Sequence, residues 1–402
     1  MKPFKKVIAI VLALVLIASV VGCTPISMSK QWSYDYNDDT LSEQLDIGVY
    51  IYSMSQAYNN AKTYAEKSKD YKEGESFLDL EIKDDDGNKA VAKDWIKTEA
   101  EKISVSLLAI DYLVNKYDAT WDEATMSSAI QQSKTAWEMG YYAALGYSQY
   151  YQPLKDELEP KGVSYDSFEK SSFVASVKQD AIFDALYSEG GEKAVSDKEL
   201  EKYFLDEYVA YSYIPVNMYT SETNDAGEST SVAFSKKKMD STVEKLNAYA
   251  DKLANGLSID KVIDGCVKDF DISESSAVKD TVEIFSTTKS SNADIAKAVK
   301  SLNSGEAKVI TVGEDSDSPI AYLVFKDDIN AKTKDYLKKD SNRDSVLQNM
   351  KKDEFTDFIE ATTEELLKSD ALAKNSGAID KYDPAMFYEK PEETTAASDS
   401  TE

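Results

Sequence analysis

The chain of 402 residues contains no histidine. Because histidine is the side chain that titrates near neutral pH, its absence excludes Ser/His/Asp and Cys/His catalysis and any histidine-ligated zinc site. Glycine is also scarce, with 15 residues scattered along the chain, and no glycine-rich phosphate-binding loop is present. Acidic pairs are so frequent that no single pair indicates a glycosidase. We therefore expect neither a cofactor nor a metal.

The N-terminus has the pattern of an export signal. Lysines at positions 2, 5 and 6 precede an apolar run of about 15 residues, which is shorter than a membrane span and typical of a signal peptide. The sequence VVGC, which ends at Cys23, resembles a bacterial lipobox, in which the cysteine becomes the first residue and carries diacylglycerol and an acyl chain. The alternative is an ordinary signal peptide with an incidental cysteine. We expect removal of residues 1–22, lipidation of Cys23 and anchoring on the extracytoplasmic face of the bacterial membrane.

Cys266 is the second of only two cysteines. With Cys23 lipidated, it has no partner for an internal disulfide. Its neighbours Val262, Ile263 and Val267 form an apolar, helix-like context, where a lone thiol usually packs as a small hydrophobic side chain. We therefore expect Cys266 to have no redox or nucleophilic role.

Basic residues are few relative to acidic ones, 46 against 73, and the net charge is −27. This balance disfavours binding to nucleic acid or to anionic lipid through charge. The hydrophobic content of 42% and aromatic content of 11% favour a folded protein, long enough for one large domain or two to three ordinary ones.

Hydrophobic periodicity predicts an α+β protein that is mostly helical. Over residues 92–117, apolar side chains recur every three or four residues, which predicts a long amphipathic helix. Ser196 and Glu199 form a capping box that predicts a helix over residues 197–207. The other predicted helices begin near Thr40 and cover residues 122–151, 165–187, 237–254, 293–302 and a stripe from 346 to 367.

A small α/β module is expected inside this helical chain, over residues 209–328. It opens with the strand-like run VAYSYIPV and closes with the β-rich runs AKVITV and PIAYLVF. Outside it, Trp32 and Tyr34 interrupt an otherwise polar segment that suits a tether. The predicted organisation is a signal peptide (1–22), a tether (23–39), a helical domain in two parts (40–207 and 331–388), the α/β domain (208–330) and a disordered acidic tail (389–402).

Tyrosine is abundant, with 26 residues. One interpretation of a cluster near Trp137 and Met139 is helix packing. The alternative is a broad apolar surface for unfolded chains, because tyrosine offers a large contact area with few rotors and methionine adds plasticity. The clustered tyrosines are Tyr141, Tyr142, Tyr147, Tyr150 and Tyr151.

Three stretches carry a resemblance to the PrsA/SurA group of extracytoplasmic foldases. SDKELEKYF before VAYSYIPV looks like the entry into a parvulin-type prolyl isomerase domain. NADIAKAVKSLNSGEAKVITV looks like the late helix and strand of that domain, and ALAKNSGAIDKYDPAMF looks like the closing segment of the family. The resemblance covers most of residues 40–388. It implies a helical chaperone lobe built from N- and C-terminal segments, with an inserted parvulin-like α/β domain.

The resemblance also implies where an isomerase site would lie. Parvulin sites use two histidines on the central strands, and here Tyr213 and Tyr322 occupy those positions, with Phe285 as a third site position. A tyrosine phenol does not titrate near neutrality, so we expect this site to be degenerate. Rotation about a prolyl amide needs no proton transfer in principle, which leaves an active histidine-free isomerase as the alternative.

The function that the resemblance implies is a membrane-anchored chaperone that assists the folding of exported proteins. Its partners would be unfolded or nascent exported proteins and, through the lipid, the membrane, but no nucleic acid. Whether the chain forms a homodimer is open. A further alternative is a solute-binding lipoprotein, a class that usually has two α/β lobes with repeated βαβ units.

Overall fold

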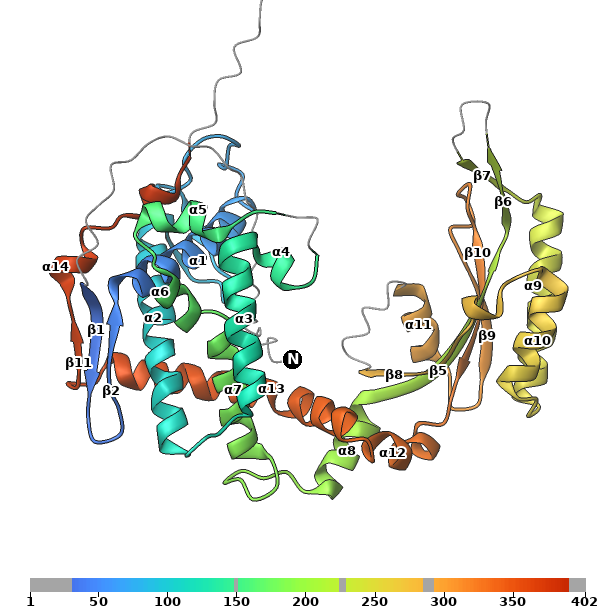
Figure 1. Ribbon diagram of the computed structural model, residues 1–402. Coiled ribbons are helices and arrows are strands. Elements are labelled where there is room, and N and C mark those ends of the chain that lie inside the picture. The colour runs from blue at the N-terminus through green and yellow to red at the C-terminus, as the bar shows by residue number, and fades with distance from the viewer. Residues whose placement is uncertain (1–30, 148–150, 224–228, 285–292, 390–402) are drawn as a thin grey trace, which may run out of the picture. The chain divides into compact units, whose positions relative to one another are not determined.

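The computed structural model describes residues 31–389, apart from residues 148–150, 224–228 and 285–292 (Figure 1). Two compact units divide the chain: unit 1 combines Met1–Ala194 with Lys351–Glu402, and unit 2 is Val195–Met350. The predicted class, α+β and mostly helical, is confirmed. Within the described ranges, no helix combines the length and the apolar character that a bilayer span requires.

Several predictions fall outside the described residues. They are the signal peptide (1–22), the lipidated Cys23, the site position Phe285, the clustered Tyr150 and the acidic tail beyond residue 389.

Unit 1 contains a three-stranded antiparallel sheet in the order β11-β1-β2. Strand β1 (Trp32–Asn37) lies between β2 (Ser42–Asp46) and β11 (Leu372–Lys374), with Tyr36 opposite Leu372. Both ends of the described chain therefore pack within one unit.

The structure corrects the predicted tether and the predicted first helix. Residues 32–37 belong to the fold as β1, where Tyr34 and Tyr36 are buried. Residues 42–46 form β2, and the first helix, α1 (Ile47–Ala65), begins only after it. Strand β1 pairs on one side with β2, which follows it directly, and on the other side with β11, which lies far away in the sequence. Local periodicity gives no sign of the β11 pairing.

The remaining elements of unit 1 are mostly helices. Strands β3 (Glu81–Lys83) and β4 (Lys89–Val91) form a hairpin. The helices are α2 (Ala92–Lys116), α3 (Glu123–Met139), α4 (Tyr141–Ala144), α5 (Leu154–Leu158), α6 (Tyr165–Lys170), α7 (Phe173–Tyr187), the second part of α13 (Asp340–Leu367) and α14 (Ser376–Ile379).

Helix α2 agrees with its prediction to one residue, whereas α3 is shorter than predicted. It ends at Gly140, whose φ of 112° lies in the region that favours glycine. A Cβ at this position would stand 2.6 Å from the carbonyl oxygen of Gln152, so the returning chain passes too close for any other residue.

Aromatic rings join the helices of unit 1. Phe168 of α6 is buried and packs against Tyr52 of α1 and Trp137 of α3, with ring centroids 5.3 and 5.4 Å away. Phe355 of α13 meets Phe183 of α7 edge to face at 5.3 Å. These contacts make one core from segments far apart in the sequence.

Unit 2 is built on a four-stranded antiparallel sheet in the order β8-β5-β10-β9. Its elements are α8 (Asp197–Glu207), β5 (Tyr208–Asn217), β6 (Tyr219–Thr223), β7 (Ser229–Ala233), α9 (Lys236–Ala254), α10 (Ile259–Phe270), β8 (Val278–Ile284), α11 (Ala293–Ser301), β9 (Ala307–Val312), β10 (Ile320–Lys326), α12 (Ile329–Leu337) and the first part of α13.

Unit 2 is larger than the predicted α/β domain. The capping box of α8 is present, with both the Ser196 and the Glu199 hydrogen bonds formed. Phe204 of α8 stacks on Tyr208 at 4.8 Å and on Tyr336 of α12 at 5.0 Å. These ring contacts explain why α8 and α12 belong to unit 2 rather than to the helical domain.

The two faces of this sheet are covered by different helices (Figure 1). Helices α9 and α10 pack on the face that carries Ile214 and Leu323. Helix α11 packs on the face that carries Val209 and Val324. Because successive side chains of a strand point to opposite faces, each position of β5 and β10 is assigned to one of these two environments.

Candidate functional site

The structure places Tyr213 and Tyr322 on neighbouring central strands, on the face covered by α11. Their rings are 6.0 Å apart between centroids and inclined by 67°. Tyr213 stands opposite Val324 and Tyr322 opposite Pro215, so the two tyrosines are diagonal neighbours across the β5–β10 ladder.

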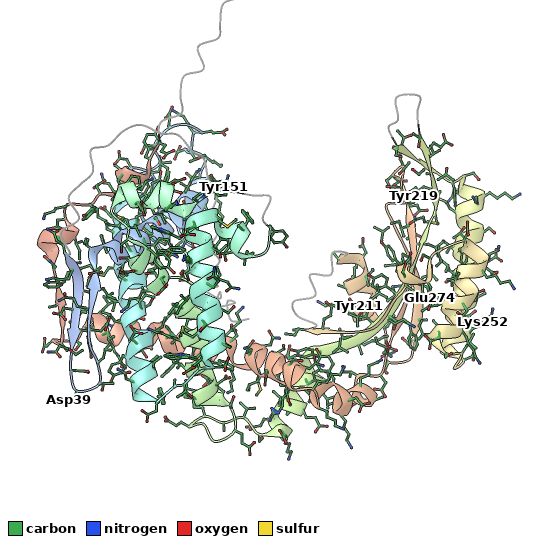
Figure 2. The ribbon with its side chains drawn as sticks, viewed as in Figure 1. Asp39, Tyr151, Tyr211, Tyr219, Lys252 and Glu274 are labelled. Atoms are coloured by element: carbon green, nitrogen blue, oxygen red, sulfur yellow. The ribbon has the colours of Figure 1, made fainter. Side chains whose placement is uncertain are left out.

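Tyr211 is a third tyrosine on this face, and the sequence interpretation did not include it. It is 4% exposed, stacks on Tyr213 at 6.3 Å, and its hydroxyl donates a hydrogen bond to Glu283 of β8. Figure 2 shows Tyr211 on the α11 side of the sheet, away from Lys252 on α9. The signal available in the sequence was the alternation of tyrosines at 211 and 213, which places both on one face.

The environment of these phenols keeps them protonated. Burial raises the pKa of Tyr211, and the hydrogen bond and negative charge of Glu283 add to this. Burial also raises the pKa of Tyr213, with further contributions from Tyr322 and Glu283. A phenol that stays neutral can donate a hydrogen bond or pack against an apolar ring, but it does not exchange a proton near neutral pH as histidine does.

Helix α11 packs against the sheet face that carries the tyrosines. Its residues Ile295, Ala298 and Val299 are buried against the sheet, and Tyr213 and Tyr322 are half-buried beside them. The chemistry that this face offers is therefore aromatic contact with hydroxyl hydrogen bonds.

A different kind of surface lies in unit 1, along α3, α4 and the segments that flank them. Of the eight large hydrophobic side chains that are exposed among the described residues, seven lie between positions 121 and 151. We call these seven the apolar surface of unit 1: Trp121, Ile130, Met139, Tyr142, Leu145, Tyr147 and Tyr151.

Buried neighbours fix the base of this surface. Trp137 is only 5% exposed, and Tyr141 stacks on Phe173 of α7 at 5.7 Å with an interplanar angle of 14°. Tyr142 and Tyr147, in contrast, are 46% and 54% exposed. The predicted tyrosine cluster thus divides into packed and exposed members.

Sequence reasoning missed Trp121, Ile130 and Leu145, which are also part of this surface. Ile130 and Leu145 lie on segments predicted as one continuous helix. The break at Gly140 ends α3, and the chain beyond it, including Leu145, turns outward. The glycine itself was the available signal.

A shallow groove of about 520 Å³ lies between α3 and α7. Small side chains such as Ala124 and Ser128 line one wall, and Phe173 and Val177 line the other.

Cys266 lies in unit 2 and is fully buried between α9, α10 and the sheet. Burial raises the pKa of its thiol to about 12, and Asp269 adds to this effect. The sulfur is therefore a protonated, packed atom at neutral pH. Across the described ranges, no three Cys, His, Asp or Glu side chains form a group that would hold a metal ion.

Comparison with known proteins gives only structural likenesses. No protein-family model and no curated protein matches the chain. The foldase protein PrsA from Streptococcus pneumoniae is similar at 13% identity and a TM-score of 0.33, over 73% of this chain and 97% of that one. PrsA from Bacillus subtilis is similar at 14% identity and a TM-score of 0.26, over 73% of this chain and 93% of that one.

Proposed function

We propose that this protein is a lipid-anchored extracytoplasmic chaperone that binds unfolded exported proteins and lacks histidine-based prolyl isomerase chemistry. The apolar surface of unit 1 is the observation that carries the proposal. Exposed apolar side chains that gather in one place are typical of an interaction surface, and Tyr142, Leu145 and Tyr147 follow closely on one another in and just after α4.

The chemistry of this surface suits clients without a fixed structure. Tyr142, Tyr147 and Tyr151 provide large rings with a polar edge, and Met139 provides a side chain that adapts its shape. Binding through many weak apolar contacts does not require a defined sequence in the client.

The charge of the chain favours an unfolded client over a second copy of the protein. Two copies, each with a net charge of −27, repel each other, whereas a segment that combines apolar and basic residues is attracted. We therefore assign the surface to apolar, basic segments of exported proteins.

Suppression of client aggregation tests this proposal. A reduced, denatured client is diluted with stoichiometric protein, and light scattering is followed. We expect the wild-type chain to suppress scattering and the triple variant Tyr142→Ser/Leu145→Ser/Tyr147→Ser to lose most of this effect, because the exposed contact area is removed with little change to the core.

The matched control is Val232→Ser, which removes the exposed hydrophobic side chain outside the apolar surface, on β7 of unit 2. It should suppress scattering as the wild type does. Absence of suppression by the wild type, or equal suppression by the triple variant, would contradict the proposal.

Anchoring through Cys23 is part of the proposal because the VVGC motif follows a signal-like N-terminus. A tether at the membrane raises the local concentration of chaperone where exported chains emerge. In bacteria fed radioactive palmitate, the wild-type chain should be labelled and remain with the membrane, while Cys23→Ala should be unlabelled. Equal labelling of both would rule out this acceptor site.

A further inference from the structure

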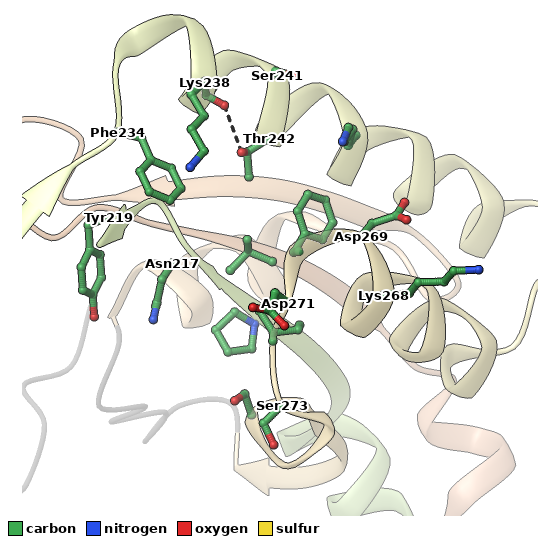
Figure 3. Close-up of a pocket in the computed structure, with 16 residues that line it drawn as sticks. Asn217, Tyr219, Phe234, Lys238, Ser241, Thr242, Lys268, Asp269, Asp271 and Ser273 are labelled. Carbon is green, nitrogen blue, oxygen red and sulfur yellow. Dashed lines mark hydrogen bonds between the residues drawn. The ribbon is translucent and has the colours of Figure 1, made fainter. Parts of the chain in front are cut away.

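Unit 2 contains a pocket of about 690 Å³ on the α9 side of its sheet (Figure 3). The end of β5, the first turns of α9 and the C-terminal end of α10 surround it. Its volume lies within the range of sites that bind small molecules or a few peptide side chains. The pocket is on the sheet face opposite to Tyr213 and Tyr322.

Three lysines line this pocket in a strongly acidic chain. Lys238 and Lys245 are seven residues apart on α9, which places them on one face of the helix, and Lys268 comes from α10. Among the described residues, neither Lys245 nor Lys268 has an ion-pair partner. By contrast, nearby Lys236, which is outside the lining, lies within 4 Å of both Asp240 and Glu314.

Two acidic residues also line the pocket, and one of them is hydrogen-bonded within unit 2. Asp269 accepts a hydrogen bond of 2.8 Å from the hydroxyl of Tyr249. Asp271 is the other acid in the lining. Lysines therefore outnumber acids around the pocket, in a protein where acids outnumber lysines overall.

Aromatic and amide groups lie beside the lysines. The ammonium of Lys238 is 3.2 Å from the centroid of the Phe234 ring, and Figure 3 shows Tyr219 and Asn217 on the same side of the pocket. Phe270 also belongs to the apolar part of the lining. The side-chain amide of Asn217 hydrogen-bonds to no other residue that the structure describes, which leaves it available to a peptide backbone.

We propose that this pocket binds an acidic peptide segment. Carboxylates of the peptide pair with Lys238 and with Lys245, an apolar side chain between them packs against Phe234 and Phe270, and Asn217 hydrogen-bonds the peptide backbone. A small inorganic anion would use the polar groups alone and would gain nothing from the apolar area that Phe234 and Phe270 contribute to the lining. The pocket belongs to unit 2 alone, so the inference does not depend on the apolar surface of unit 1.

Fluorescence anisotropy of a labelled peptide with alternating Glu and Phe tests the proposal on the full chain. We expect saturable binding that weakens as salt is added, because exposed ion pairs are screened. The same peptide with Gln in place of Glu should bind much more weakly. The variant Lys238→Glu/Lys245→Glu should lower the affinity for the acidic peptide by about tenfold or more, since two exposed ion pairs become repulsive.

The matched control is Lys237→Glu/Lys252→Glu, which changes the charge of α9 by the same amount at two positions outside the lining. It should retain most of the affinity. Lys238→Gln/Lys245→Gln provides a milder change, with an intermediate loss expected, and far-ultraviolet circular dichroism checks that each variant is folded.

Three results would overturn the proposal: equal binding of the Glu and Gln peptides, equal loss in the matched control, or full displacement of the peptide by inorganic phosphate at similar concentration. The last result would identify a simple anion site. The Tyr142→Ser/Leu145→Ser/Tyr147→Ser variant should bind the acidic peptide normally, so this site and the chaperone function can fail separately.

Discussion

The tyrosines around α4 in unit 1 and the tyrosines on β5 and β10 in unit 2 have opposite environments. Tyr147 and Tyr151 are 54% and 66% exposed, and neighbouring Leu145 and Met139 are exposed with them. Tyr211 is buried and its hydroxyl is hydrogen-bonded to Glu283. Tyr213 and Tyr322 are half-buried on the sheet face that α11 packs against.

This difference shows that aromatic content does not by itself identify a binding surface. The sheet tyrosines alternate with residues of the opposite face, so all three lie on the face that α11 packs against, where Tyr211 is buried and Tyr213 and Tyr322 are half-buried. Beyond Gly140, Tyr141 stacks on Phe173 of α7, whereas Tyr142, Tyr147 and Tyr151 are exposed. Exposure therefore depends on what packs above each segment, and unit 1 offers the apolar contact area that unit 2 conceals.

The largest expected effect is a loss of stability in unit 1 when a buried aromatic side chain is removed from its core. All four tryptophans, at positions 32, 95, 121 and 137, belong to unit 1, so tryptophan fluorescence reports its unfolding alone. Phe168→Ala should lower the free energy of unfolding of unit 1 by about 3–5 kcal/mol, because it removes a buried ring between Tyr52 and Trp137. Urea denaturation followed by tryptophan fluorescence measures the change.

The matched variant is Phe204→Ala, which removes a similarly buried ring from unit 2. It should leave the tryptophan transition in place and shift a transition followed by circular dichroism. An equal shift of the tryptophan transition would show that the two units unfold together. The prediction that they differ in stability would then be wrong.

A smaller effect is expected at the start of α8. Ser196→Ala removes the side-chain oxygen that accepts from the backbone N–H of Glu199 and breaks the reciprocal capping box. The free energy of unfolding of unit 2 should fall by about 1 kcal/mol. Circular dichroism during denaturation measures this loss. Since aspartate also provides a side-chain oxygen at the N-cap, Ser196→Asp should retain most of the stability, and an equal loss in both variants would contradict the capping argument.

The smallest expected effect is on prolyl isomerisation. The chain should not accelerate cis–trans exchange of an Xaa-Pro peptide measured by NMR, because no histidine is present and Tyr211 is hydrogen-bonded to Glu283. The rate should stay at the buffer value from about pH 6 to about pH 9, since the pKa values of Tyr211 and Tyr213 are raised above the usual value of about 10. A clear acceleration would show that unit 2 has an active histidine-free site.

Local patterns were enough to predict the elements that local forces determine. The apolar stripe of α2 and the capping box of α8 gave their bounds to within one residue. The strands β5, β9 and β10 were recognisable from β-branched and aromatic runs. In each case the signal lies within the element itself.

Elements that depend on distant partners could not be predicted in this way. Strands β1 and β11 are short, and each is stabilised by pairing with the other across nearly the whole chain. The β6–β7 hairpin is rich in Ser and Thr and has no apolar alternation to mark it.

The same limit applies to the candidate sites. The sequence placed Tyr213 and Tyr322 on neighbouring strands, but it gave no sign that α11 would cover them. It also gave no sign that Lys238, Lys245 and Lys268 from two helices would meet around one pocket.

The pairing of β1 with β11 sets an order of events for a newly made polypeptide. The strands of the unit 2 sheet are all synthesised by Lys326, whereas Leu372–Lys374 is synthesised only after the whole of unit 2, which ends at Met350. Unit 2 can thus fold before β11 is available to pair with β1. This pairing is slow because it closes the long loop between the two strands. A stop codon shortly before Leu372 would therefore leave unit 2 intact, whereas unit 1 would lack strand β11.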